Sequence, residues 1–245
     1  MNNGQELNCF LLHGWGVSNS VWEGFAEQLK SFKIVGAPCL YTASGKAKNV
    51  EALAETIKDK IENDTVVVAW SLGGLVATRL ASLSNKIKAI VYIASSPCFV
   101  NKPDWKNVLD DKSIHDLQDS MINDPGATLE YFAGLIAHGD KDTKKAIRMI
   151  RKNLAKEKYS QTLSVWLNEL LEQDQRKEFS ALNIPTLHVL AEGDALINHR
   201  IENQIKQLQP TSECAVIKNS CHAPFVGQAE TTAKIINEFI SARFK

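Results

Sequence analysis

Residues 66–77 have the sequence VVVAWSLGGLVA. A run of β-branched apolar residues leads directly into Ser71, and small residues and a helical pattern follow. This order is typical of a nucleophile elbow, a tight strand-to-helix turn that exposes a serine hydroxyl above a sheet. Such a turn crowds the backbone, and the small residues Ala69, Gly73 and Gly74 suit it. The helix N-terminus behind Ser71 would direct backbone N–H groups at an oxyanion. The alternative is a tight turn with no catalytic role.

The composition limits the class of protein. A chain of 245 residues with 44% apolar residues suits one large domain or a domain with an insertion. Lys and Arg (28) balance Asp and Glu (28), so net charge does not favour a nucleic-acid or membrane partner. No apolar run approaches the ~20 residues of a membrane span, and residues 1–6 lack the features of a secretory signal. We expect a cytoplasmic monomer that binds neither nucleic acid nor membrane.

The cysteines do not indicate a metal site or a disulfide framework. The five cysteines are scattered, and none lies in a CxxC pair or at a Cys/His ligand spacing. They are Cys9, Cys39, Cys98, Cys214 and Cys221. Reduced thiols in a cytosol fit this pattern best. We expect neither a metal nor a cofactor.

Strand and helix patterns alternate along most of the chain, which predicts an α/β fold. The alternation predicts a mostly parallel sheet of about six strands with helices on both faces. The predicted strands cover residues 7–12, 34–35, 65–69, 87–94, 186–190 and 214–217. The predicted helices among them cover residues 22–30, 50–61, 75–83 and 229–242.

The middle of the chain lacks strand patterns. Helical stretches are expected at residues 114–122, 127–137, 144–154 and 161–171. We therefore predict a helical cap at residues 100–179, inserted over the C-terminal edge of a sheet formed by residues 1–99 and 180–245.

A serine hydroxyl needs a base to take its proton, and the chain offers a base and an acid at suitable places. His222 follows the last predicted strand, and Asp194 follows the strand before it. An aspartate there would orient the imidazole and stabilise its charged form. The order Ser71, Asp194, His222 is that of α/β-hydrolases. Either residue alone could be an ordinary loop residue, and Glu192 is a rival acid.

The segment His13-Gly14-Trp15-Gly16 follows the first predicted strand. The corresponding loop of this architecture supplies an oxyanion donor. We assign the two donors to the backbone N–H groups of Trp15 and Leu72. An ordinary strand-ending turn is the alternative.

Several of these pieces resemble the α/β-hydrolase superfamily, and more closely the pimeloyl-[acyl-carrier protein] methyl ester esterases of biotin synthesis. The matching segments are Leu11-Leu12-His13-Gly14-Trp15-Gly16, Trp70-Ser71-Leu72-Gly73-Gly74-Leu75-Val76-Ala77, Ala94-Ser95-Ser96-Pro97-Cys98-Phe99 and His222-Ala223-Pro224-Phe225. The resemblance extends from about residue 7 to the C-terminus, although the cap matches only loosely.

The resemblance implies a serine carboxylesterase that cleaves the methyl ester of a pimeloyl chain carried by an acyl carrier protein, through an acyl-enzyme. Ser71 would be the nucleophile, His222 the base and Asp194 the orienting acid. Trp15 and an apolar cap segment would line the acyl channel. In this chain that segment is Phe132, Ala133, Gly134, Leu135 and Ile136. The alternative for these cap residues is the buried face of a packed helix.

Three features depart from the family pattern. Ala69 replaces the usual first glycine of the elbow. Residues 37–44 (APCLYTAS) replace the usual Asp-x-Pro-Gly-x-Gly-x-Ser turn at the pocket rim. Only six residues precede the first predicted strand, so we expect the antiparallel strands that often open this fold to be missing.

Residues 141–158 carry eight basic side chains against two acidic ones, Asp142 and Glu157. The resemblance places Lys144 and Arg148 where the family docks its acidic carrier protein. A solvated helix face is the alternative.

Two other functions stay open: a generic short-chain carboxylesterase or lipase-like hydrolase, and a non-catalytic ligand-binding protein on a hydrolase scaffold.

Overall fold

The computed structural model of the chain describes residues 7–43, 47–156 and 160–244. Its centre is a six-stranded sheet in the order β2-β1-β3-β4-β5-β6, and every neighbouring pair is parallel. The strands are β1 (Leu7–Leu12), β2 (Phe32–Gly36), β3 (Thr65–Trp70), β4 (Ile87–Ile93), β5 (Thr186–Ala191) and β6 (Glu213–Ile217). This confirms the predicted parallel sheet. The described residues contain no antiparallel strand before β1, and residues 1–6 lie outside them.

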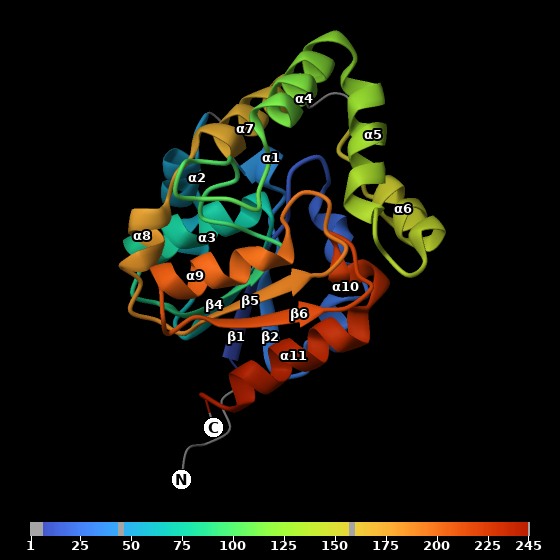
Figure 1. Ribbon diagram of the computed structural model, residues 1–245. Coiled ribbons are helices and arrows are strands. Elements are labelled where there is room, and N and C mark those ends of the chain that lie inside the picture. The colour runs from blue at the N-terminus through green and yellow to red at the C-terminus, as the bar shows by residue number, and fades with distance from the viewer. Residues whose placement is uncertain (1–6, 44–46, 157–159, 245) are drawn as a thin grey trace.

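Helices cover both faces of the sheet (Figure 1). On one face, α2 (Val50–Ile57) packs against α3 (Leu72–Leu83), and α3 packs against β1, β3 and β4. On the other face, α11 (Ala229–Ser241) packs against β5 and β6. Four shorter helices complete this part of the chain: α1 (Leu40–Ala43), α8 (Arg176–Ser180), α9 (Glu202–Leu208) and α10 (Pro224–Gly227).

The first four described helices after β4 gather at one end of the molecule, beyond the sheet (Figure 1). They are α4 (Asp111–Asn123), α5 (Pro125–Ala137), α6 (Thr143–Lys152) and α7 (Ser160–Glu172). An aspartate caps each of the first three helices by accepting a hydrogen bond from the first turn. Four helices therefore occupy the four stretches where the sequence predicts them.

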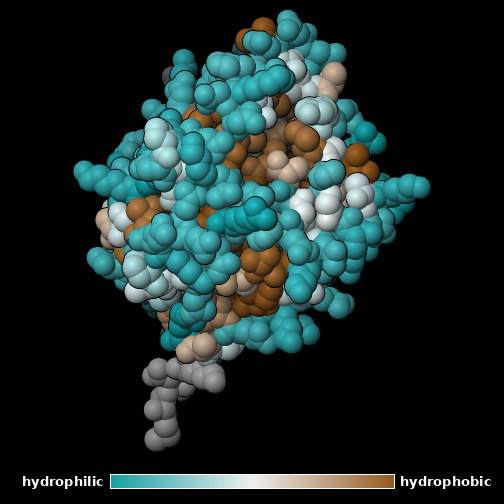
Figure 2. Space-filling model, viewed as in Figure 1, coloured by the Kyte–Doolittle hydropathy of each residue, from teal (hydrophilic) through white to brown (hydrophobic). Residues whose placement is uncertain are grey.

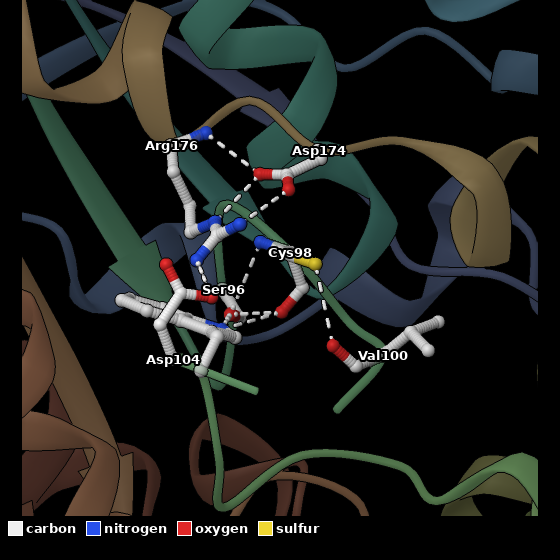
Figure 3. Close-up of polar contacts among 7 residues, drawn as sticks. Ser96, Cys98, Val100, Asp104, Asp174 and Arg176 are labelled. Carbon is white, nitrogen blue, oxygen red and sulfur yellow. Dashed lines mark hydrogen bonds and ion pairs between the residues drawn. The ribbon is translucent and has the colours of Figure 1, made fainter. Parts of the chain in front are cut away.

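The chain enters and leaves this helical region at adjacent places. Cys98 and Asp174 pair in a short antiparallel bridge, and the Gln175 N–H donates to the carbonyl of Pro97 at 2.8 Å. Figure 3 shows the side chains that reinforce this crossing. Arg176 forms ion pairs with Asp174 (2.7 Å) and Asp104 (2.9 Å). Hydrogen bonds from Arg176 lower the pKa of Asp174, so the carboxylate stays charged.

Two predicted helices differ from the structure. The helix predicted at residues 22–30 is wrong, because the chain forms two short 3₁₀ turns, Asn19–Trp22 and Ala26–Gln28. Gly24 separates them with φ +77°, a conformation that a helix cannot contain. Helix α3 begins at Leu72, three residues earlier than predicted, because it starts immediately after the turn at Ser71.

The described residues also limit other kinds of site. All five cysteines are unpaired. No group of three or more His, Cys, Asp or Glu side chains in the described ranges could hold a metal ion. None of the helices formed by these residues has the length and hydropathy that a bilayer crossing requires.

Candidate active site

Ser71 occupies a strained turn between β3 and α3. Its φ of 52° and ψ of −120° lie outside the regions that residues with a Cβ favour. Three hydrogen bonds hold the residue there. The Ser71 N–H donates to Ile93 (3.0 Å), and its carbonyl accepts from the Gly74 N–H and from Ser95 Oγ, both at 2.8 Å. Ser71 is only 4% exposed.

The glycines after Ser71 are required by close packing. A Cβ on Gly73 would lie 2.5 Å from the carbonyl oxygen of Leu12. A Cβ on Gly74 would lie 2.0 Å from Ser95 Oγ. Ala69, which departs from the family glycine, lies fully buried in β3 and pairs with Leu12 and Tyr92. The strained turn forms with this alanine in place.

Asp194 and His222 meet at the carboxyl ends of β5 and β6. His222 Nδ1 lies 2.8 Å from Asp194 Oδ2, and each side chain is about 1% exposed. The other carboxylate oxygen, Oδ1, accepts from the backbone N–H groups of Leu196 (2.8 Å) and Ile197 (3.0 Å). With Nδ1 donating to the carboxylate, Nε2 is left as the proton acceptor of the ring. The rival acid Glu192 is exposed and accepts from the Asn219 N–H instead.

The imidazole of His222 and the hydroxyl of Ser71 are not hydrogen-bonded to each other. His222 Nε2 is buried and has no hydrogen-bond partner among the described residues, so it makes no hydrogen bond with Ser71 Oγ. The two residues are linked through Trp70, which precedes Ser71. The Trp70 indole N–H donates to the carbonyl of His222 at 2.8 Å, and the rings are 5.8 Å apart. Catalytic hydrogen bonds of this kind often tighten only when substrate is bound.

The loop after β1 lies against the elbow. A Cβ on Gly14 would lie 3.1 Å from the Cβ of Ser71. The backbone N–H groups of Trp15 and Leu72 make no hydrogen bond to any described residue, so both can donate to an oxyanion. The indole of Trp15 is anchored by a 2.8 Å hydrogen bond to the carbonyl of Leu163 in α7.

The predicted cap segment, residues 132–136, spans from residues 13–16, named the oxyanion loop for their proposed role, to His222. Phe132 packs edge-to-face on Trp15, with ring centroids 4.8 Å apart. At the other end, the carbonyl of Ile136 accepts from the backbone N–H of His222 at 3.1 Å. Phe132, Ala133 and Ile136 are buried, and Gly134 and Leu135 are half-buried. Figure 2 shows apolar side chains gathered between α4 and α5, on the side that faces the sheet.

Helix α6 carries the predicted docking residues. Lys144 and Arg148 are both exposed, and neither forms an ion pair with another described residue. Arg151 on the same helix differs, because it pairs with Glu130 of α5 at 2.6 Å.

Sequence reasoning missed several residues that support this site. Tyr41 and Ser95 bond to the oxyanion loop and to the elbow, and Leu129 lies beside Gly16. Ser95 belongs to Ala94–Phe99, one of the segments that resemble the family, but this motif indicated no role for it. Tyr41 stood in the segment that departs from the family turn, and no motif indicated it.

Comparison with known proteins agrees with this arrangement. The sequence model of the α/β hydrolase fold family matches residues 10–228. The chain therefore belongs to the α/β-hydrolase fold family. Similar solved structures include a bromoperoxidase from Bacillus anthracis (TM-score 0.82, 20% identity, 98% of this chain and 93% of that one). An esterase from Exiguobacterium antarcticum is also similar (TM-score 0.80, 14% identity, 98% and 93%). At these identities they show the fold alone.

Curated relatives identify the group within this family. The chain is 31% identical over 247 residues to the pimeloyl-[acyl-carrier protein] methyl ester esterase of Aeromonas hydrophila, covering 97% of this chain and 96% of the relative. It is 29% identical over 244 residues to the enzyme of the same name from Vibrio cholerae, covering 97% and 95%. The chain belongs to the family of pimeloyl-[acyl-carrier protein] methyl ester esterases.

Proposed function

We propose that this chain hydrolyses the methyl ester of a pimeloyl group carried by an acyl carrier protein, with Ser71 as nucleophile. The observation that carries the proposal is the buried hydrogen bond between His222 and Asp194, at the same sheet edge as a serine held on a strained turn. The names of the curated relatives support the choice of substrate.

The reaction would proceed through an acyl-enzyme. Ser71 Oγ attacks the ester carbonyl while His222 Nε2 takes its proton. The N–H groups of Trp15 and Leu72 stabilise the oxyanion. His222 then returns the proton to the leaving oxygen, and methanol departs. A water molecule, deprotonated by His222, then attacks the acyl-enzyme carbonyl. The bond to Ser71 Oγ breaks, His222 returns the proton to Ser71 Oγ, and the free acid is released. Asp194 holds the imidazole in the required tautomer throughout.

The helical region would supply the specificity. We place the cap at residues 100–179 and the hydrolase core at residues 1–99 and 180–245. The segment Phe132–Ile136 would line the acyl chain, because it lies between Trp15 and His222. Lys144 and Arg148 would dock the acidic carrier, because both are exposed and lack acidic partners among the described residues.

A comparison of rates tests the function. We expect the wild-type chain to hydrolyse carrier-bound pimeloyl methyl ester faster than free pimeloyl methyl ester or p-nitrophenyl acetate. Ser71→Ala should abolish all three activities and leave the thermal unfolding cooperative. Equal rates on all three esters would favour a generic carboxylesterase. A stoichiometric burst without turnover would indicate a binding protein.

Charge reversal tests the docking surface. Lys144→Glu with Arg148→Glu should raise KM for the carrier-bound ester and leave hydrolysis of the free ester unchanged. The effect should shrink as salt rises, because exposed charges are screened beyond about 8–10 Å at physiological ionic strength. Lys206→Glu with Lys234→Glu makes the same change of net charge on α9 and α11, and should affect neither substrate. An equal rise in KM for both esters would contradict carrier docking.

A further inference from the structure

The hydroxyl of Tyr41 lies within the oxyanion loop, between the two peptide groups that flank Trp15. It accepts a hydrogen bond from the Gly16 N–H at 2.7 Å and donates one to the carbonyl of Gly14 at 3.4 Å. Tyr41 is 5% exposed and comes from the short helix α1, 25 residues along the chain from Gly16. Burial raises the pKa of Tyr41, so the hydroxyl keeps the proton that it donates.

His13 makes a second connection between the same loop and α1. Its Nε2 lies 2.8 Å from the backbone N–H of Leu40, which can only donate. Nε2 is therefore the unprotonated nitrogen, and Nδ1 carries the proton and donates to the carbonyl of Gly14 at 2.8 Å. Burial lowers the pKa of His13 to about 4, which keeps this neutral form. The His13 ring packs edge-on against Tyr41, with centroids 5.3 Å apart.

These bonds fix the direction of the proposed oxyanion donor. The carbonyl of Gly14 and the N–H of Trp15 belong to one planar trans peptide group, so they point in opposite directions. Holding the carbonyl on His13 and Tyr41 therefore aims the Trp15 N–H away from them. The bond from the Gly16 N–H holds the peptide on the other side of Trp15. Together they restrict both backbone dihedrals of Trp15.

We propose that Tyr41 is a positioning residue that aims the backbone N–H of Trp15 at the oxyanion of the reacting ester. The proposal rests on the proposed esterase function. Tyr41 lies in the segment 37–44, where this chain departs from the family turn motif. Tyr41 would act through the loop, because its hydroxyl bonds to Gly14 and Gly16.

The test is Tyr41→Phe, which removes the hydroxyl and keeps the ring. Tyr92→Phe is the matched control, because its buried hydroxyl bonds to Thr78 Oγ1 at 2.8 Å, away from the oxyanion loop. With p-nitrophenyl acetate, we expect Tyr41→Phe to lower kcat by about 10- to 100-fold, less than the loss of a whole oxyanion donor. KM should change less than about twofold, because the ground-state ester does not use the donor.

A transition-state analogue separates positioning from general destabilisation. A phenylboronic acid forms a tetrahedral adduct on the Ser71 hydroxyl and places a boron-bound oxygen at the oxyanion site. Its affinity should fall in Tyr41→Phe by the same factor as kcat. In Tyr92→Phe both quantities should match wild type, although the melting temperature should fall in both variants. Equal kcat and boronate affinity in the two variants would overturn the proposal.

A second substitution keeps the proposal testable if Tyr41→Phe does not fold. Replacement of Tyr41 by 3-fluorotyrosine retains the ring and the hydroxyl and makes the oxygen a weaker acceptor for the Gly16 N–H. We expect a smaller fall in kcat at an unchanged melting temperature. An unchanged kcat would count against the positioning role of Tyr41. If wild type itself shows no Ser71-dependent turnover, the proposed function fails; if only the Tyr41 variants behave like the control, only this inference fails.

Discussion

Gly139 and Gly193 lie back to back, with no room for a side chain between them. A Cβ on Gly139 would lie 2.1 Å from the carbonyl oxygen of Gly193, and a Cβ on Gly193 would lie 2.6 Å from that of Gly139. Gly139 ends the turn that follows α5, and Gly193 precedes Asp194. Next to this contact, the Lys141 N–H donates to the carbonyl of Asn219, and the Gly193 N–H donates to the carbonyl of Ser220. The turn between α5 and α6 is thus packed against both loops that carry the proposed acid and base.

Gly139→Ala should therefore impair the chemistry from outside the site. The methyl group would displace the loop of Asp194, and a displacement of about 1 Å can cost on the order of 10²-fold in rate. Gly139 also has φ +82°. We expect kcat for p-nitrophenyl acetate to fall by about 10²-fold, measured beside the melting temperature.

Gly24→Ala is the control for backbone strain alone. Gly24 has a similar φ of +77°, but a Cβ there would meet nothing within 4 Å. The Gly24→Ala variant should lose about 1–2 kcal/mol of stability and keep the wild-type kcat. If Gly139→Ala loses stability and keeps kcat, the turn supports the fold and does not position the site.

Asp194→Asn should lower kcat by about 10⁴-fold, as the equivalent change does in serine proteases, because an amide favours the wrong imidazole tautomer. Glu192→Gln tests the rival acid and should keep most of the activity, because the Glu192 carboxylate accepts a hydrogen bond from the Asn219 N–H and none from His222 among the described residues. Steady-state kinetics on one activated ester would compare the two variants. A larger loss in Glu192→Gln would reverse the assignment.

Ser71→Gly should be more stable than Ser71→Ala, although both are inactive. Both lack the hydroxyl, but alanine keeps the cost of φ 52°, which is about 1–3 kcal/mol for such a conformation. Glycine lowers the free energy of unfolding by about 0.5–1 kcal/mol, because the unfolded chain gains entropy. Urea unfolding should give a difference of about 1 kcal/mol in favour of glycine. Equal stabilities would mean that the strain at Ser71 is no larger than the entropic cost of glycine, about 0.5–1 kcal/mol.

His188 should make stability depend on pH below neutrality. The ring is fully buried in β5, stacked on Tyr92 at 4.6 Å, and burial lowers its pKa from 6.5 to about 3. Between these values the unfolded chain binds a proton that the native state does not. The free energy of unfolding therefore falls as pH falls below 6.5, by about 1.4 kcal/mol per pH unit for this residue.

The substitution that checks this is His188→Phe, which removes the titrating group and keeps an aromatic ring. Denaturant unfolding of both chains from about pH 6 to about pH 4 should give a shallower slope for the variant, by about 1.4 kcal/mol per pH unit. Other acid-sensitive groups contribute equally to both chains and cancel in the difference. Parallel curves would exclude His188 as the source.

The parts of the structure that the sequence predicted are those with a local signal. The buried strand at residues 65–69 and the small residues after Ser71 indicated the elbow, and the cap helices followed from apolar periodicity. The start of α3 was missed because Gly73 and Gly74 are poor helix formers. The 3₁₀ turns around Gly24 were missed because apolar spacing alone does not reveal a glycine with positive φ.

The contacts that escaped prediction join residues far apart in the chain. The bond from Leu40 to His13 spans 27 residues, and that from Gly16 to Tyr41 spans 25. A four-residue helix such as α1 has too few positions to show periodicity. The catalytic roles of Ser71, Asp194 and His222, and the docking role of Lys144 and Arg148, remain predictions for the experiments above.

The bridge between Cys98 and Asp174 has a consequence for how such enzymes diversify. Because the chain departs and returns at neighbouring backbone positions, the intervening stretch can be exchanged for that of a relative as a cassette, with both splice points closed by the same short pairing. We expect a graft of this kind to carry the specificity proposed for the helical region onto an unaltered sheet. It would have to retain a glycine opposite Gly193, since the two backbones leave no room for a Cβ there.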